Sequence, residues 1–80
     1  MIAGFDSTGP HLYYCDNDGN RIEGRSFAVG SGGTYAYGVL DIYYKDSLNL
    51  DEAVELGKRA ISEATYMDAG SGGYLSLIHI

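Results

Sequence analysis

Length, composition and charge restrict what this chain can be. It has 80 residues and a formal net charge of −6 at pH 7, with five Lys and Arg residues against eleven Asp and Glu residues. A chain of this length forms one small domain that buries only about 60% of its unfolded surface. The shortage of basic residues excludes a surface for nucleic-acid phosphates. The single cysteine excludes an internal disulfide, so we expect a reducing compartment.

The first part of the chain is predicted to form strands. Residues 1–5 and 12–15 are short apolar runs, and each is followed by turn residues. Residues 16–20 are predicted to form a hairpin turn, because Asn, Asp and Gly tolerate the positive φ of such turns. Residues 21–29 alternate and should pair back across that turn. A calcium loop beginning at Asp16 is disfavoured, because its twelfth position would be Phe27 rather than Glu.

Two helices are predicted after the strands. The hydrophobic period changes beyond residue 30, which predicts a helix over residues 31–44. A second helix over residues 50–67 should begin at a capping box formed by Asn49 and Glu52. The first helix has an apolar face made of Tyr35, Ala36, Val39, Leu40 and Tyr43. The second has a stripe of small residues that permits close packing, namely Ala53, Gly57, Ala60 and Ala64.

The last residues, 74–80, have apolar side chains at both odd and even positions, and are predicted to form a buried central strand. The predicted order is therefore β-β-β-α-α-β in the α+β class, with both helices packed on the same face of the sheet. The other face would stay bare, and the last strand ends without a turn signal. We therefore expect residues 1–80 to be part of a domain that is truncated at both ends. No long apolar run or leader-like pattern is present, so neither a membrane span nor a signal peptide is expected.

Three polar residues at element ends form a candidate hydrogen-bonding set. In the stretch 64–73, Asp68 and Ser71 lie three positions apart, where the second helix gives way to glycines. Ser31 lies in the Gly-Ser-Gly-Gly stretch at 30–33, which is not a phosphate loop because no Gly-Lys-Ser/Thr follows. No base or activated nucleophile is evident beside these residues, so they do not make a complete active site.

Simpler interpretations of the same residues are favoured by the residue patterns alone. Asp68 is then a turn residue at a helix end, and Ser31 is an ordinary N-cap. His11 and His79 are interpreted as structural, because neither is paired with a cysteine or serine. Cys15, within a strand, is interpreted as a small buried hydrophobe.

Motifs along nearly the whole chain resemble the β-type subunits of the 20S proteasome, and among these the eukaryotic beta type-5 subunits. The resemblance covers the chain in order and without gaps. The motifs are Ile-Ala-Gly-Phe-Asp (2–6), Gly-Pro-His-Leu-Tyr-Tyr (9–14), Asp-Gly-Asn-Arg (18–21), Phe-Ala-Val-Gly-Ser-Gly (27–32), Tyr-Ala-Tyr-Gly-Val (35–39), Ala53, Arg-Ala-Ile (59–61), Ala-Thr-Tyr (64–66) and Asp-Ala-Gly-Ser-Gly-Gly (68–73).

The resemblance implies a fold and a function. The fold would be the C-terminal half of the αββα sandwich of N-terminal-nucleophile hydrolases. The activity would be that of a threonine-type endopeptidase with chymotrypsin-like specificity, which degrades unfolded or ubiquitin-targeted proteins in the cytoplasm and nucleus. The partners would be other proteasome α and β subunits in heteromeric rings. No cofactor, metal, nucleic acid or membrane is expected.

The resemblance also implies roles for the candidate residues. Ser31, Asp68 and Ser71 match positions that surround the N-terminal threonine of the family and hold its α-amine and a water molecule. The family's threonine, lysine, first aspartate and oxyanion donor lie in a preceding half, so this chain is expected to be inactive alone. Residues 33–34 imitate the self-cleavage dipeptide but lack the following Thr-Thr-Leu, and residues 74–80 lack the usual Asn-x-Tyr. The alternative is a non-catalytic β-type paralogue or truncated product with a role only in ring assembly.

Overall fold

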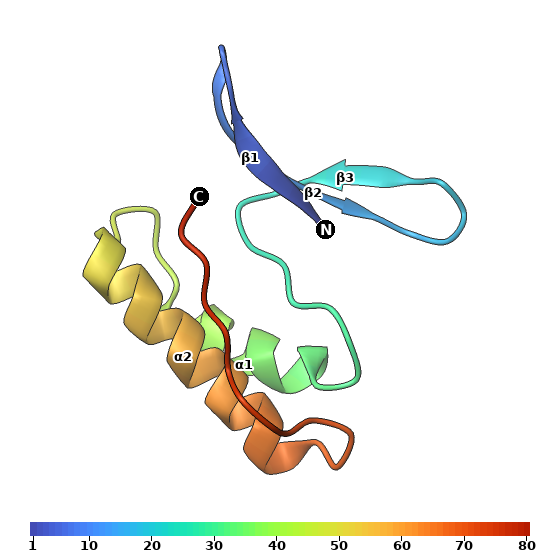
Figure 1. Cartoon of the computed structure of the whole chain (residues 1–80), viewed down its shortest axis with the longest axis vertical. Helices are drawn as coiled ribbons and strands as arrows, with labels where there is room; N and C mark the ends of the chain where they lie inside the picture. Colours follow the sequence, from blue (N-terminus) through green and yellow to red (C-terminus); the bar gives the residue numbers. More distant parts are fainter.

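The computed structural model describes all residues from 1 to 80 and contains a small sheet and a pair of helices (Figure 1). The elements are, in chain order, β1 (Ile2–Asp6), β2 (Gly9–Cys15), β3 (Arg21–Glu23), α1 (Gly33–Tyr43) and α2 (Leu50–Met67). The predicted order β-β-β-α-α is thus confirmed for five elements. The sixth, a strand over residues 74–80, is wrong, since these residues form no strand.

The sheet is antiparallel with strand order β1-β2-β3. Asp6 pairs with Gly9 at the β1–β2 turn, and Tyr13 pairs with both Ile2 of β1 and Glu23 of β3. Because side chains alternate between faces, this register places Asp6, His11, Tyr13 and Glu23 on the same face. Leu12 is on the opposite face.

The turn at residues 16–20 forms as predicted. The Asp16 carboxylate accepts hydrogen bonds at 2.9 Å from the backbone N–H groups of Asp18 and Asn20. Gly19 supplies the positive φ of +86° that the turn requires. Cys15, at the end of β2, is exposed, so the prediction that it is buried is wrong. It pairs with Arg21 and so lies on the polar face of the sheet.

The third strand is shorter than predicted, since residues 24–29 leave the sheet. The Phe27 ring folds back over Gly24, where an added Cβ would lie only 2.6 Å from Phe27 Cζ. The same ring packs near Tyr14, with 6.0 Å between ring centroids. Burying this aromatic ring against Gly24 and Tyr14 therefore turns the chain toward α1 instead of extending β3.

The second helix has the predicted bounds and the predicted capping box. Glu52 N–H donates to Asn49 Oδ1 at 2.8 Å, and Asn49 N–H donates to Glu52 Oε1 at 3.1 Å. The small residues of α2 allow α1 to approach closely, and the buried contact consists of Ala36, Ala60 and Ala64. None of the helices is long and apolar enough to cross a bilayer.

The helices pack against each other and not on the sheet, so the predicted packing of both on one sheet face is wrong (Figure 1). The apolar stripe of α2 is used in the contact with α1, and sheet residues such as Phe5 and Ile22 remain exposed. A polar link between the two parts is the ion pair between Arg25 and Asp46, at 2.9 Å. A groove of about 590 Å³ separates Leu12 of β2 from the helix pair.

The C-terminal residues 74–80 run in an extended conformation beside α2 (Figure 1). A Cβ added to Gly57 of α2 would lie 3.7 Å from Leu77 Cδ1, which is ordinary contact. A strand needs a neighbouring strand to bond its backbone. The β1–β3 sheet does not supply one at this position, which is why the apolar pattern alone gave the wrong prediction.

Candidate functional site

The three candidate residues lie together at the ends of the two helices. Ser31 Oγ donates a hydrogen bond to Asp68 Oδ2 at 2.6 Å, and Ser71 Oγ donates to the same oxygen at 2.7 Å. We call these three residues the helix-end cluster. The predicted hydrogen-bonding set is therefore present, and its role in catalysis stays a prediction.

Local backbone geometry positions each member. Asp68 is the C-cap of α2, and its N–H donates to the Ala64 carbonyl at 2.8 Å. The Ser71 N–H then donates to the Asp68 carbonyl at 3.1 Å, which closes a turn that returns the Ser71 hydroxyl to the carboxylate. Ser31 comes directly after Gly30, whose φ of +114° only glycine adopts readily.

The close approach of the two helix ends requires a glycine at position 32. An added Cβ on Gly32 would lie 2.9 Å from Ala64 Cβ and 2.9 Å from Ser71 Oγ. Real Cβ atoms do not tolerate such distances, so any side chain would push the start of α1 away from α2. Gly32 is also the N-cap of α1 and makes no side-chain cap. The interpretation of Ser31 as the N-cap is therefore wrong, because its hydroxyl reaches Asp68 instead.

The electrostatics of the cluster favour a charged carboxylate. The Ser31 hydroxyl, followed by the Ser71 hydroxyl, lowers the pKa of Asp68 below its ordinary value, and partial burial opposes this effect only in part. Both hydroxyls bond to Oδ2, and the other oxygen, Oδ1, accepts no side-chain hydrogen bond. Asp68 at neutral pH thus carries a charge that both hydroxyls bond through Oδ2 and that the Gly70 backbone also stabilises.

The hydroxyls of the cluster border the groove between the sheet and the helices. Ser31 and Ser71 both line it, together with Ala36 and Ala60 of the helix contact. No side chain that lines the groove is an imidazole, amine, carboxylate or thiol. The carboxylate that accepts from both serines is a weak base, because the pKa of Asp68 is lowered, and so neither hydroxyl is an activated nucleophile. The cluster therefore supplies acceptors and donors but no activated group, and no group of three His, Cys, Asp or Glu side chains could hold a metal ion.

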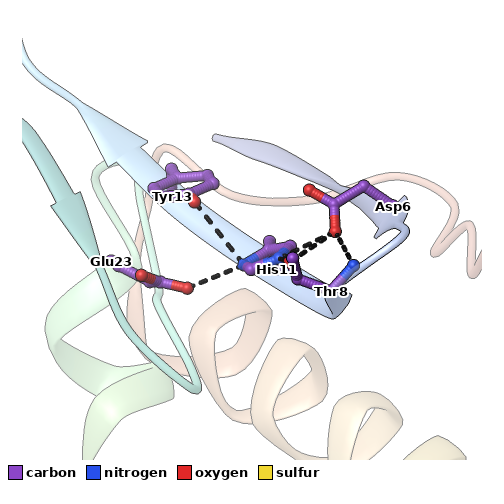
Figure 2. A network of polar contacts seen from close by, with 5 residues as sticks. All are labelled: Asp6, Thr8, His11, Tyr13 and Glu23. Atoms are coloured by element: carbon purple, nitrogen blue, oxygen red, sulfur yellow. Dashed lines mark hydrogen bonds and ion pairs between the residues drawn. The ribbon is translucent and has the colours of Figure 1, made fainter.

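Sequence reasoning missed a second polar cluster, which lies on the sheet around His11 (Figure 2). His11 Nδ1 is 2.9 Å from Glu23 Oε1, and Nε2 is 2.6 Å from Thr8 Oγ1. Nε2 also lies 3.1 Å from Asp6 Oδ1. The alternation of side chains along the strands could have revealed this cluster, because the register places Asp6, His11 and Glu23 on one face. It was overlooked because only cysteine and serine were considered as partners of the histidine.

Comparison with known proteins agrees with the motifs. The proteasome family, described as "Proteasome subunit", matches residues 1–80. The beta type-5 subunits of Dictyostelium discoideum and Spinacia oleracea are each 56% identical to this chain over 80 residues, which is 100% of this chain and 29% of each relative. The Homo sapiens beta type-8 subunit is 50% identical over 80 residues, again 100% of this chain and 29% of the relative. The chain therefore spans 29% of the length of these relatives. It belongs to the proteasome subunit family, among the β-type members, and is similar to the beta type-5 subunits.

Proposed function

We propose that this chain is part of a catalytic beta type-5-like proteasome subunit, a threonine-type endopeptidase with chymotrypsin-like specificity. The observation that carries the proposal is the shared bond at Asp68, where two hydroxyls from different helix ends hold one carboxylate oxygen. The similarity to beta type-5 subunits over the whole chain supports the same assignment.

The chemistry of this arrangement suits a supporting role. A hydroxyl nucleophile needs a base, and an N-terminal residue can supply one through its own α-amine. The negative charge of Asp68 would stabilise the ammonium that forms when the amine takes a proton. Ser31 and Ser71 would fix the carboxylate and order a water molecule beside it. In this role the three residues assist the reaction without forming a covalent bond.

The same proposal implies the substrates, the partners and the location of the protein. Substrates would be unfolded or ubiquitin-targeted polypeptides cleaved after large apolar residues. The partners would be other α and β proteasome subunits in the cytoplasm and nucleus. The exposed apolar side chains of the sheet, such as Phe5 and Ile22, are consistent with a surface that another segment or subunit covers.

Reconstitution tests the proposal. The 80-residue chain alone should not hydrolyse a fluorogenic peptide with a large apolar P1 residue. The same chain continuous with a preceding segment that begins with a free threonine should hydrolyse it when assembled with partner subunits. The matched control is the same subunit with its N-terminal amine acetylated, which should be inactive because the base is lost.

Each contrary outcome has a distinct meaning. Turnover by the 80-residue chain alone would show that the role assignment of its serines is wrong. Assembly of the complete subunit into rings without any turnover would favour the alternative of a non-catalytic β-type paralogue. Turnover that survives acetylation would mean that the α-amine is not the base.

A further inference from the structure

The His11 cluster, which consists of Asp6, Thr8, His11 and Glu23, connects the two edge strands of the sheet through β2. Asp6 ends β1, His11 lies in β2 and Glu23 ends β3, so one imidazole bridges carboxylates from both neighbouring strands (Figure 2). The His11 side chain is 25% exposed, whereas Asp6 and Glu23 are 60% and 56% exposed. The bridge is therefore centred on a partly buried ring, and both of its carboxylate partners remain accessible to water.

The donor count depends on the charge of the ring. A carboxylate only accepts, so the 2.9 Å contact to Glu23 requires a proton on Nδ1. In the imidazolium, Nε2 also carries a proton and donates to Thr8 Oγ1 at 2.6 Å. The Thr8 hydroxyl is then free to donate to Asp6 Oδ1, also at 2.6 Å. Every short contact in the charged cluster thus contains one proton.

When the His11 imidazolium loses one proton to solvent, the contacts among His11, Thr8 and Asp6 no longer contain one proton each. If Nδ1 keeps its proton for Glu23, Nε2 becomes an acceptor that faces the Thr8 hydroxyl. The single hydroxyl proton of Thr8 then serves either Nε2 or Asp6 Oδ1, but not both. The bare Nε2 lone pair also lies 3.1 Å from the Asp6 carboxylate, which is an unfavourable contact. Asp6 therefore loses the proton of the ring and shares the Thr8 hydroxyl with Nε2, keeping only the Thr8 N–H bond undisturbed, while Glu23 keeps its bond.

We propose that His11 is a pH-sensitive lock on the β1–β2 turn, which holds Asp6 through Thr8 when the ring is protonated and releases it when the ring is neutral. The bond between His11 and Glu23 persists in both states. Deprotonation consequently loosens the turn at residues 7–8 without separating β2 from β3.

The electrostatics of the cluster agree with this geometry. The hydrogen bond to Glu23, followed by the charge of Asp6, raises the pKa of His11 above its ordinary value of 6.5. Because the folded pKa is raised, the stabilisation is fully present below pH 6.5 and is lost as the pH rises through the folded pKa of His11. Hydrogen bonds from Thr8 lower the pKa of Asp6, so Asp6 stays charged across this window.

The other charged groups near the ring do not replace its partners. The Tyr13 ring stacks on the imidazole at 5.9 Å and is itself covered by the Arg21 guanidinium at 4.6 Å. Arg25 lines the same hollow as His11 but is paired with Asp46 at 2.9 Å. Tyr44, which lines that hollow from the end of α1, has a raised pKa because of burial and so stays neutral.

Nuclear magnetic resonance of the 80-residue chain tests the lock. Ring ¹⁵N shifts should show a raised His11 pKa and, at high pH, a neutral tautomer that carries its proton on Nδ1. Glu23→Gln should lower the His11 pKa, and the matched control Glu63→Gln, which removes an exposed carboxylate of α2, should not.

Backbone exchange gives a second readout, because the other hairpin turn offers a matched control. Thr8 N–H donates to Asp6 Oδ1 at 2.7 Å, and Asp18 N–H donates to Asp16 Oδ1 at 2.9 Å without a histidine nearby. The protection of Thr8 relative to Asp18 should fall several-fold as the pH passes the His11 pKa, and His11→Gln should abolish that change. A His11 pKa at or below its ordinary value, an Nε2–H tautomer, or a pH-independent ratio in the wild type would each overturn the proposal. An unfolded hairpin would overturn it as well, because the lock requires β1 paired with β2.

Discussion

The helix-end cluster and the His11 cluster contain the same basic unit, an aspartate oxygen that accepts a hydroxyl, but they differ in what completes it. Asp6 Oδ1 takes the Thr8 hydroxyl and faces His11, a group that can gain or lose a proton. Asp68 Oδ2 takes two serine hydroxyls, and no imidazole, amine, carboxylate or thiol side chain lines the groove that these serines border. In both units the side-chain bonds go to one carboxylate oxygen, so the difference lies in the partners: Asp6 faces an ionisable ring, and Asp68 faces only hydroxyls. The second unit has no ionisable partner of its own among these side chains.

The largest expected difference between the two clusters is in catalysis. In a complete subunit with a free N-terminal threonine, Asp68→Asn should lower the turnover of a fluorogenic peptide by roughly 100-fold or more, because a charge that stabilises an ammonium becomes a neutral amide. Ser31→Ala and Ser71→Ala should cost less, since water replaces a hydroxyl in part. Asp6→Asn is the matched control and should leave turnover unchanged. Equal losses for Asp6→Asn and Asp68→Asn would remove the distinction.

A substitution that separates the helix ends should affect only one cluster. Gly32→Ala places a Cβ 2.9 Å from Ala64 Cβ and should lower the free energy of unfolding, by about 1–3 kcal/mol for overpacking of this kind. Gly38→Ala in α1 is the matched control, since its added Cβ would meet no atom within 4 Å outside its own stretch of helix. Replacing an open helical glycine should stabilise by about 0.5–1 kcal/mol. Urea unfolding measures both. Similar effects of the two substitutions would show that the close approach is not needed.

The capping box of α2 gives a smaller effect. Asn49→Ala removes the acceptor of the 2.8 Å bond from Glu52 N–H and should destabilise the helix, at a typical cost of about 1 kcal/mol. The loss should appear in helical circular dichroism on urea titration and leave the hairpin resonances around Asp16 unchanged. If the hairpin resonances change together with the helix, the two parts do not unfold independently.

The pH dependence should separate the clusters most finely. The lowered pKa of Asp68 means that its stabilising contribution is full above pH 3.8 and is lost as the pH falls through its folded pKa. The raised pKa of His11 places its loss on the alkaline side of pH 6.5. Unfolding free energies measured from acid to alkaline pH should therefore show an acid loss that Asp68→Asn reduces and an alkaline loss that His11→Gln removes. An alkaline loss that persists in His11→Gln would contradict this assignment.

What the sequence predicted depended on how local the interaction is. The capping box at Asn49 and the turn at Asp16 are hydrogen bonds within a few residues, and both were predicted from residue type and spacing alone. The helix-end cluster spans 37 positions between Ser31 and Asp68. Its members were identified because glycines flank them at element ends, and their roles came from the resemblance.

The predictions that failed involve partners that a local pattern does not specify. Residues 74–80 have a strand-like sequence but no neighbouring strand, and the apolar face of α2 is used by α1 rather than by the sheet. Ser31 has the residue type of an N-cap, but Asp68 offers its hydroxyl a charged acceptor at 2.6 Å. The His11 cluster required the register of both hairpins, which composition does not give.

The most direct test of the central claim is the titration of the Asp68 carboxyl carbon by ¹³C magnetic resonance, in the wild-type chain and in Ser31→Ala/Ser71→Ala. The matched control is Ser62→Ala, which removes an exposed hydroxyl of α2. If both hydroxyls donate to one Asp68 oxygen, the pKa of Asp68 should lie below 3.8 in the wild type and rise in the double variant, with no change in the control. A wild-type pKa at or above 3.8, or one that the double variant leaves unchanged, would contradict the shared bond on which the proposed function rests.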